Sequence, residues 1–184
     1  MKLFKILIFI FTSLAISIKA YSNEKLEILL QEGGKLLIIR HAYAPGTGDP
    51  ENFNVNDCTT QRNLNEKGIV ESKKLGTFFF KHKIKIDKVL SSEWCRCKDT
   101  AFYAFKGYKQ KSFLNSFYSE KFAHKKLSQM KKLREYIKEW KGKQNLVLVT
   151  HYVVISELLN IGTLPAEVIV TDKSLKILGR MKLK

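Results

Sequence analysis

Two histidines and two arginines of this chain are suited to phosphoryl chemistry. Arg40 and His41 are neighbours, whereas Arg96 and His151 lie far along the sequence. A neutral imidazole is a good nucleophile towards phosphorus near neutral pH, and a guanidinium group binds phosphoryl oxygens in a bidentate way. If the fold brings the four together, His41 can accept a phosphoryl group while Arg40 and Arg96 neutralise its charge and His151 hydrogen-bonds it. A single histidine after a strand is more often a plain loop residue, so the combination carries the hypothesis.

The elements that must position these residues can be predicted from apolar patterning. Short apolar runs at 35–40, 86–90 and 145–150 are typical of buried parallel strands, and Arg40-His41, Ser91-Ser92 and Thr150-His151 stand at their ends. Helical spacing predicts helices over 65–81, 93–105, 122–140 and 153–160, and the runs 166–171 and 175–181 predict a terminal pair of strands. The alternation indicates an α/β fold with a mostly parallel sheet. Ligands bind at the carboxyl ends of such strands, which is where the three ends would meet.

Polar residues mark the ends of the predicted helices. Asn63 or Asn65 is expected to cap the helix over 65–81, and Ser92 the helix that begins at Glu93. The segment 42–63 is a long polar loop, and a loop of that length in a compact domain is usually functional.

The first residues differ from the rest of the chain. Lys2 and Lys5 precede an apolar stretch that ends at Ala20, after which the chain turns polar. This pattern predicts a signal peptide over 1–20 and a single domain over 21–184, and therefore a periplasmic or secreted protein. The alternative is an uncleaved membrane anchor, but the apolar stretch is shorter than the ~20 residues of a spanning helix.

The composition is strongly basic. The formal net charge is +16, and the chain without residues 1–20 keeps +13, because Lys2, Lys5 and Lys19 are the charged residues there. Such a charge favours anionic partners, a small phosphorylated substrate or an anionic envelope surface, although a lysine-rich solvated surface is an equally good reading. The lysines are spread out and no nucleic-acid motif is present, so we expect no nucleic acid.

Three cysteines, Cys58, Cys95 and Cys97, allow one disulfide in an oxidising compartment. Cys58 could bridge to Cys95 or to Cys97, or all three could be small apolar core residues. Their spacing does not indicate a metal site.

The ordered motifs resemble those of the histidine phosphatase superfamily, also called phosphoglycerate mutase-like. The run Leu36–Ala42 resembles its Arg-His signature, and Arg62–Gly68 its Leu-Thr/Ser-x-x-Gly helix start. Val89–Ala101 resembles the Ser-Ser-x-x-x-Arg-x-x-x-Thr-Ala motif, and 146–151 the strand before the second histidine. The resemblance implies a three-layer α/β sandwich, a phosphohistidine intermediate at His41, a phosphate pocket completed by Arg40, Arg96 and His151, and no metal or other cofactor.

The chain departs from the family pattern in three places. Ala42 and Thr150 replace common glycines, and the glutamate usual after the second arginine motif has no clear counterpart. Asp57, Glu93 and Glu120 are the candidate proton donors. We favour Asp57, because the loop after His41 must cover the site, although Asp57 could equally be a turn residue bonded to its own backbone. Arg62 is either a further phosphate ligand or the partner of a carboxylate.

Within the superfamily, Asp57–Leu64 and Trp94–Cys97 resemble an exported bacterial subgroup near a periplasmic lipopolysaccharide-core sugar phosphatase. This predicts a phosphomonoester hydrolase whose substrate is an envelope sugar phosphate. The alternatives are a non-catalytic phosphate- or phosphoglycan-binding module of the same fold and, from charge alone, a basic envelope-surface or nucleic-acid-binding protein. Residue patterns do not predict the oligomeric state.

Overall fold

The computed structural model describes residues 24–183 and is built on one six-stranded sheet. Its strands are β1 (Leu36–Arg40), β2 (Ile86–Ser91), β3 (Lys109–Gln110), β4 (Asn145–Thr150), β5 (Val168–Thr171) and β6 (Ile177–Met181). They lie in the order β3-β2-β4-β1-β5-β6. The pairs β1–β4, β2–β4 and β2–β3 are parallel, whereas β5 and β6 join antiparallel at one edge. The sheet is therefore mostly parallel, as predicted.

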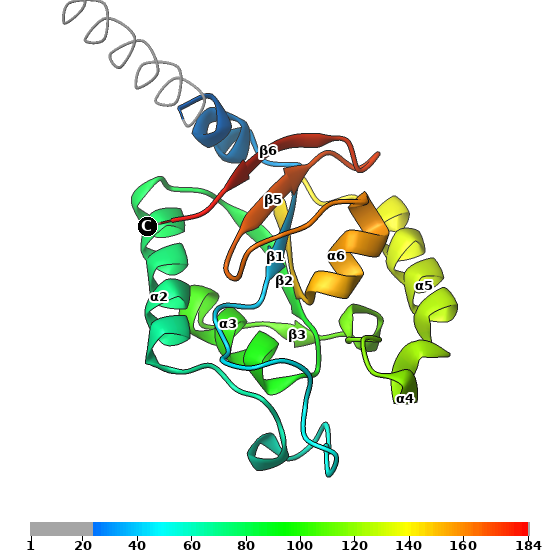
Figure 1. Cartoon of the computed structure of the whole chain (residues 1–184). Coiled ribbons are helices and arrows are strands. Elements are labelled where there is room, and N and C mark those ends of the chain that lie inside the picture. The colour runs from blue at the N-terminus through cyan, green and yellow to red at the C-terminus, as the bar shows by residue number, and fades with distance from the viewer. Residues whose placement is uncertain (1–23, 184) are drawn as a thin grey trace, which may run out of the picture.

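Helices cover both faces of the sheet (Figure 1). One face packs against a helix over 24–32, α2 (Glu66–Lys81) and α3 (Cys95–Phe105), and the other against α5 (Lys126–Glu139) and α6 (Tyr152–Leu159). The side chains of β1 alternate between the two apolar clusters, with Leu37 and Ile39 in the first and Leu36 and Ile38 in the second. This is the three-layer α/β fold that the sequence motifs imply.

The register of the sheet aligns the strand ends that carry the predicted site. Arg40 at the end of β1 lies opposite Thr150 at the end of β4, and Ser91 of β2 lies opposite Val149 of β4. The order β2-β4-β1 makes the three ends neighbours. The sequences that follow them therefore emerge side by side at one edge.

Two helix boundaries differ from the sequence prediction. Helix α3 begins at Cys95 rather than at Glu93, and its cap position is Trp94, because the Ser92 hydroxyl is hydrogen-bonded to His151 and Asn115. The helix predicted over 122–140 is broken into α4 (Glu120–Ala123) and α5. The predicted cap of α2 is confirmed at Asn65, whose side chain accepts a hydrogen bond from the Gly68 N–H.

Two short 3-10 helices, η1 (Cys58–Thr60) and η2 (Ser112–Leu114), complete the chain. The predicted signal peptide over 1–20 lies outside the described residues. Within residues 24–183, no helix combines the length and the apolar character needed to cross a membrane.

Candidate active site

A cavity of about 360 Å³ opens at the carboxyl ends of β1, β2 and β4. It brings together His41, Arg40, Arg96, His151 and Arg62, which are the predicted nucleophile and phosphate ligands. The remaining wall comes from the loop 42–63, the segment before α3, the segment 116–122 and the start of α6. The expectation that the strand ends would converge is thus met by the geometry of the described residues.

The His41 side chain is buried, and its tautomer is fixed by the backbone carbonyl of the next residue, Ala42. The His41 N–H donates to the Thr150 carbonyl at 2.9 Å, which ties the residue to the end of β4. The ring Nδ1 lies 2.8 Å from the Ala42 carbonyl oxygen. A carbonyl only accepts, so Nδ1 must carry the proton and Nε2 keeps its lone pair. His41 therefore presents an unprotonated Nε2, whose lone pair can act as a nucleophile.

The second histidine is oriented by a chain of polar side chains. His151 Nε2 lies 2.9 Å from the Ser92 hydroxyl, and that hydroxyl donates to Asn115 Oδ1 at 3.0 Å. The other ring nitrogen, Nδ1, lies 3.5 Å from Arg96 Nη2, which can only donate. Nε2 thus carries the proton, and Nδ1 is the acceptor that faces the arginine. The His41 and His151 rings lie 5.5 Å apart between centroids, close enough to contact the same phosphoryl group.

Burial and arginine charge keep both imidazoles neutral. Burial lowers the pKa of His41 well below 6.5, and the positive charge of Arg96 lowers it further. The pKa of His151 is lowered well below 6.5 by the same two causes in the same order. A neutral imidazole is the form that can attack phosphorus, so His41 is in the protonation state that a nucleophile requires.

Arg96 forms a bidentate ion pair with Asp49 in the cavity wall. Its Nη1 and Nη2 donate to Asp49 Oδ1 and Oδ2 at 2.7 and 3.2 Å, a bidentate contact beside His151. Asp49 also accepts hydrogen bonds from the Trp94 indole and the Arg62 N–H. Burial by itself would raise the pKa of Asp49, but the hydrogen bonds and charge of Arg96 outweigh it and hold that pKa below its usual value.

The other two arginines are held by backbone carbonyls. Arg40 Nη1 donates to the Thr163 carbonyl at 2.7 Å, while its buried Nε has no partner among the described residues. Arg62 donates through Nε to the Gly48 carbonyl at 2.8 Å and through Nη1 to the Ala44 carbonyl. Arg62 lines the cavity, and its side chain has no hydrogen bond to a carboxylate among the described residues. Of its two predicted roles, this favours a phosphate ligand over the partner of a carboxylate.

The inner cavity therefore has an excess of positive charge. Three guanidinium groups lie around two neutral histidines, and Asp49 is the carboxylate hydrogen-bonded to one of them. A phosphomonoester dianion would balance this excess. The arrangement can bind a phosphoryl group and offer it a nucleophile at the same time.

The three candidate proton donors do not line the cavity. Asp57, the favoured one, is fully exposed and caps η1, where its carboxylate accepts from the Thr59 N–H at 2.9 Å and the Thr59 hydroxyl at 2.7 Å. Asp57 is therefore the turn residue of the alternative interpretation, and the prediction that it is the proton donor is wrong. Glu93 accepts from Asn115 Nδ2 at 2.5 Å, and Glu120 begins α4. Neither belongs to the cavity wall.

Sequence reasoning missed Asp49, Trp94 and Asn115. Asp49 belongs to the same loop as Asp57, the loop in which a carboxyl group near the site is expected. Residue spacing does not indicate which of the two side chains points into the cavity. Asn115 is recognisable as functional only once the sheet places it beside Ser92.

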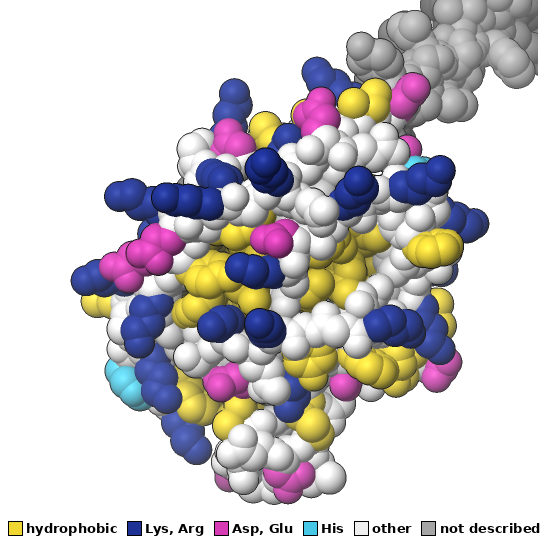
Figure 2. Space-filling view, turned by 180° about the vertical axis from the view of Figure 1, so that it is seen from behind, with side chains coloured by type: hydrophobic (Ala, Val, Ile, Leu, Met, Phe, Trp, Pro, Cys, Tyr) yellow, Lys and Arg dark blue, Asp and Glu magenta, His cyan; other side chains and the backbone are white. Residues whose placement is uncertain are grey.

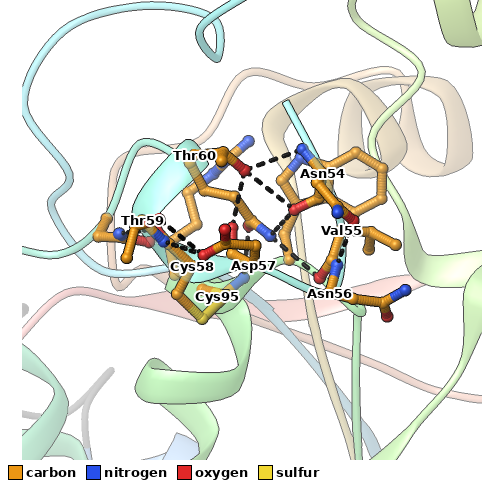
Figure 3. The surroundings of a disulfide bond; sticks show 12 residues. Asn54, Val55, Asn56, Asp57, Cys58, Thr59, Thr60 and Cys95 are labelled. Atoms are coloured by element: carbon orange, nitrogen blue, oxygen red, sulfur yellow. Dashed lines mark hydrogen bonds between the residues drawn. A yellow bond between two sulfur atoms is a disulfide. The ribbon is translucent and has the colours of Figure 1, made fainter. Parts of the chain in front are cut away.

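A disulfide anchors the loop 42–63 beside the site (Figure 3). Cys58 of η1 is bonded to Cys95, the first residue of α3, with an S–S distance of 2.03 Å. The adjacent Gln61 side chain accepts from the Cys95 N–H at 2.9 Å and donates to the Asn54 carbonyl at 2.9 Å. Cys97 is free and buried, and burial raises the pKa of its thiol to about 12. Of the pairings open from sequence, the structure has Cys58 with Cys95.

Aromatic side chains form much of the remaining wall of the cavity. The Phe53 and Trp94 rings stack with centroids 4.9 Å apart, and the Phe122 ring meets both at 5.6 and 5.5 Å. Tyr118 and Tyr152 also line the opening, and both are exposed. These rings lie beside the charged groups of the cavity, since the Trp94 and His151 ring centroids are 5.5 Å apart and Arg40 Cζ is 5.4 Å from the centroid of the Tyr152 ring.

The protein has the phosphoglycerate mutase-like α/β fold. Three solved structures with this fold illustrate the similarity. The protein histidine phosphatase SixA, solved with tungstate, superposes with a TM-score of 0.56 at 16% identity, covering 80% of this chain and 96% of that one. Phosphoglycerate mutase from Thermus thermophilus gives 0.57 at 14% identity, with 82% and 99% coverage. A mycobacterial glucosyl-3-phosphoglycerate phosphatase, solved with VO3, gives 0.51 at 14% identity, with 74% and 91% coverage.

The likeness to these proteins is one of structure rather than of sequence. No protein-family model matches the chain, and no curated protein matches it in sequence. At such low identities the superpositions establish the fold, and the chemistry must be argued from the residues of this chain.

Proposed function

We propose that the chain is a phosphomonoester hydrolase of the histidine phosphatase superfamily, acting through a phosphohistidine at His41. The observation that carries the proposal is a neutral His41 with its Nε2 lone pair free, in a cavity where three arginines face one hydrogen-bonded carboxylate. The fold supports it, since the neighbours include a protein histidine phosphatase and a glucosyl-3-phosphoglycerate phosphatase.

In the proposed first step, His41 Nε2 attacks the phosphorus atom. The new N–P bond forms as the bond from phosphorus to the ester oxygen breaks, and that oxygen leaves with the electron pair and takes up a proton. Arg40, Arg62 and Arg96 stabilise charge on the non-bridging oxygens. Neutral His151 only accepts through Nδ1, so it donates to the phosphoryl group when that nitrogen takes up a proton from solvent together with the bound dianion. Water then attacks phosphorus and gives up one proton, the N–P electrons return to Nε2, and inorganic phosphate leaves. In this scheme the arginines, rather than a metal ion, supply the positive charge.

We further propose that the substrate is an envelope sugar phosphate and that the protein works in the periplasm or outside the cell. The volume of about 360 Å³ leaves room for a leaving group beyond the phosphoryl group. The exposed Tyr118 and Tyr152 at the opening are aromatic rings of the kind that pack against the apolar face of a sugar. The disulfide supports an oxidising compartment, because such bonds are rare in the cytosol.

The test is hydrolysis of 4-nitrophenyl phosphate and of a sugar phosphate by the wild type and by His41→Ala. We expect turnover by the wild type, loss of turnover in the variant, and an acid-labile phosphate on the wild type after rapid quenching. If the wild type binds inorganic phosphate but neither turns over an ester nor traps phosphate, the chain is instead a phosphate-binding module of this fold.

A further inference from the structure

We propose that Asp49 is the catalytic acid that protonates the leaving-group oxygen and later deprotonates the attacking water. The inference rests on the proposed phosphatase function and deepens it. It assigns the role of proton donor to Asp49, since the chain has no clear counterpart of the glutamate that usually follows the second arginine motif. The assignment comes from where the carboxyl groups lie and from what each of them touches.

Position singles out Asp49 among the carboxyls near the site. Asp57, Glu93 and Glu120 are outside the cavity wall, and the first two are hydrogen-bonded elsewhere. Asp49 and Glu51 are the carboxyls of the wall. Glu51 is exposed and has no salt bridge among the described residues. Asp49, in contrast, accepts hydrogen bonds from three residues, namely Arg96, Trp94 and Arg62. Asp49 is therefore the carboxyl with a fixed place beside the reacting group.

The contacts of Asp49 couple it to phosphate binding. Its carboxylate occupies both Nη atoms of Arg96, and Nη2 also lies 3.5 Å from His151. A phosphoryl dianion between His41 and His151 competes for the same guanidinium group. It takes hydrogen bonds from Arg96 and repels the neighbouring carboxylate, and both effects favour protonation of Asp49. Binding of the substrate thus converts an arginine-paired carboxylate into an acid, with the proton taken from solvent.

The Trp94 indole keeps the carboxyl group in place while its partner changes. Trp94 Nε1 donates to Asp49 Oδ2 at 3.0 Å, and Trp94 itself is nearly fully buried and stacked on Phe53. When Arg96 turns to the phosphoryl oxygens, the indole and the Arg62 N–H still hold Asp49 in the cavity wall beside the Trp94 ring. In the proposed binding mode the leaving group lies along the wall formed by Phe53 and Trp94, which places the ester oxygen beside Asp49.

The bonds and protons of the two steps balance. In the first, the electron pair of the P–O bond moves to the ester oxygen, which accepts the Asp49 proton and departs as an alcohol. In the second, Asp49 is a carboxylate that takes one proton of the attacking water, while the N–P electron pair returns to His41 Nε2. Asp49 ends protonated, and its proton returns to solvent when phosphate leaves.

The experiment compares Asp49→Asn with the wild type on substrates that differ in leaving group. An alkyl phosphate such as glycerol phosphate needs protonation, whereas 4-nitrophenolate leaves readily without it. We expect kcat/KM of the variant to fall about 10²–10³-fold on the alkyl ester and less than about tenfold on the nitrophenyl ester. The Asp49→Glu variant should recover part of the alkyl activity, and Asp57→Asn, outside the cavity, should behave as the wild type.

Folding is controlled by inhibition with inorganic phosphate, which D49N should bind at least as tightly as the wild type, because the competing charge on Arg96 is gone. An equal loss on both esters would overturn the proposal and make Asp49 a residue that only positions Arg96. A leaving-group-dependent loss in Glu51→Gln instead of D49N would assign the acid to Glu51. A wild type inactive on both esters contradicts the phosphatase function itself, so the two failures are distinguishable.

Discussion

Two buried neutral histidines beside three arginines make the stability of the protein depend on pH. The folded-state pKa values of His41 and His151 are well below 6.5, because burial and the charge of Arg96 oppose protonation. In the unfolded chain both imidazoles take up a proton near pH 6.5. Below that pH the unfolded state binds more protons than the folded state, so stability falls as the pH falls.

The expected slope for each histidine is about 0.7 kcal/mol per pH unit at pH 6.5 and approaches about 1.4 kcal/mol per pH unit roughly one unit lower, until the folded imidazoles themselves protonate. Urea unfolding at pH 7.5, 6.0 and 5.5 measures it. His151→Gln should remove about half of the slope, whereas replacement of the exposed His124 should leave the slope unchanged. A free energy of unfolding that is flat from pH 7.5 to 5.5 would contradict the neutral, buried state of the pair.

Arg96 is the arginine whose geometry cannot be supplied by another cation. It is buried and gives two parallel hydrogen bonds to Asp49, a fork that an ammonium group cannot reproduce. In Arg96→Lys we expect kcat/KM to fall by about 10²–10³-fold, as on the loss of a transition-state donor. Arg134→Lys, an exposed change on α5, is the matched control. Comparable activity in the two variants would exclude Arg96 from the reacting centre.

At the scale of elements, the Cys58–Cys95 disulfide holds the loop 42–63 in place beside the site. The loop contributes Asp49, Phe53 and Arg62 to the cavity wall, and the Cys58–Cys95 bond fastens it to the start of α3, one residue before Arg96. Closing a loop with a sequence separation of 37 stabilises a protein by about 4 kcal/mol in the chain-entropy model. The same bond limits the freedom of the wall residues.

The double variant Cys58→Ser/Cys95→Ser is therefore expected to unfold at lower denaturant concentration and to show a raised KM with a smaller change in kcat. Thiol reduction should reproduce both effects in the wild type and have none in the double variant, which serves as the control. If the variant keeps the wild-type KM, the loop is held by its hydrogen bonds alone, such as those of Gln61.

The elements that the sequence predicted well are those with one dominant cause. Apolar runs set β1, β2 and β4, and the rule for parallel strand ends then places Arg40, His41 and His151 together. Asn65 could be identified as a cap because its contact, to Gly68, is local. The same reasoning misplaced the start of α3, since Ser92 bonds to residues that are distant in sequence.

The break between α4 and α5 has a similar tertiary cause. Helical spacing runs through 122–140, but Phe122 packs against Phe53 and Trp94 at the cavity, whereas the apolar residues of α5 pack on the sheet. One straight helix would have to satisfy both contacts. The inward turn of Asp49 instead of Asp57 also depends on a distant partner, Arg96. Local pattern therefore predicts the strands and the position of His41, whereas the position of Asp49 depends on long-range contacts.

At the scale of the whole molecule, positive charge surrounds a cationic cavity. The formal net charge is +16, and Figure 2 shows lysine and arginine side chains spread over the face seen from behind, with backbone and apolar side chains between them. A charge distributed in this way gives a positive field over a broad area rather than one binding patch. Such a field raises the rate at which an anionic substrate reaches the cavity, and salt screens it within a distance of about 8 Å at physiological ionic strength.

We therefore expect kcat/KM for a phosphomonoester dianion to fall several-fold between about 0.01 and 0.5 M sodium chloride, where the Debye length drops from about 30 to below 8 Å. The change should lie in KM, with kcat nearly constant, because the contacts inside the buried site are screened much less. Reversing the charge of exposed lysines away from the cavity, Lys73→Glu with Lys138→Glu, should reduce the salt dependence without touching the site. The neutral change Lys73→Gln with Lys138→Gln is the matched control and should have half the effect. A salt response confined to kcat, or one unaltered by the reversal, would show that local contacts rather than the overall field govern substrate capture.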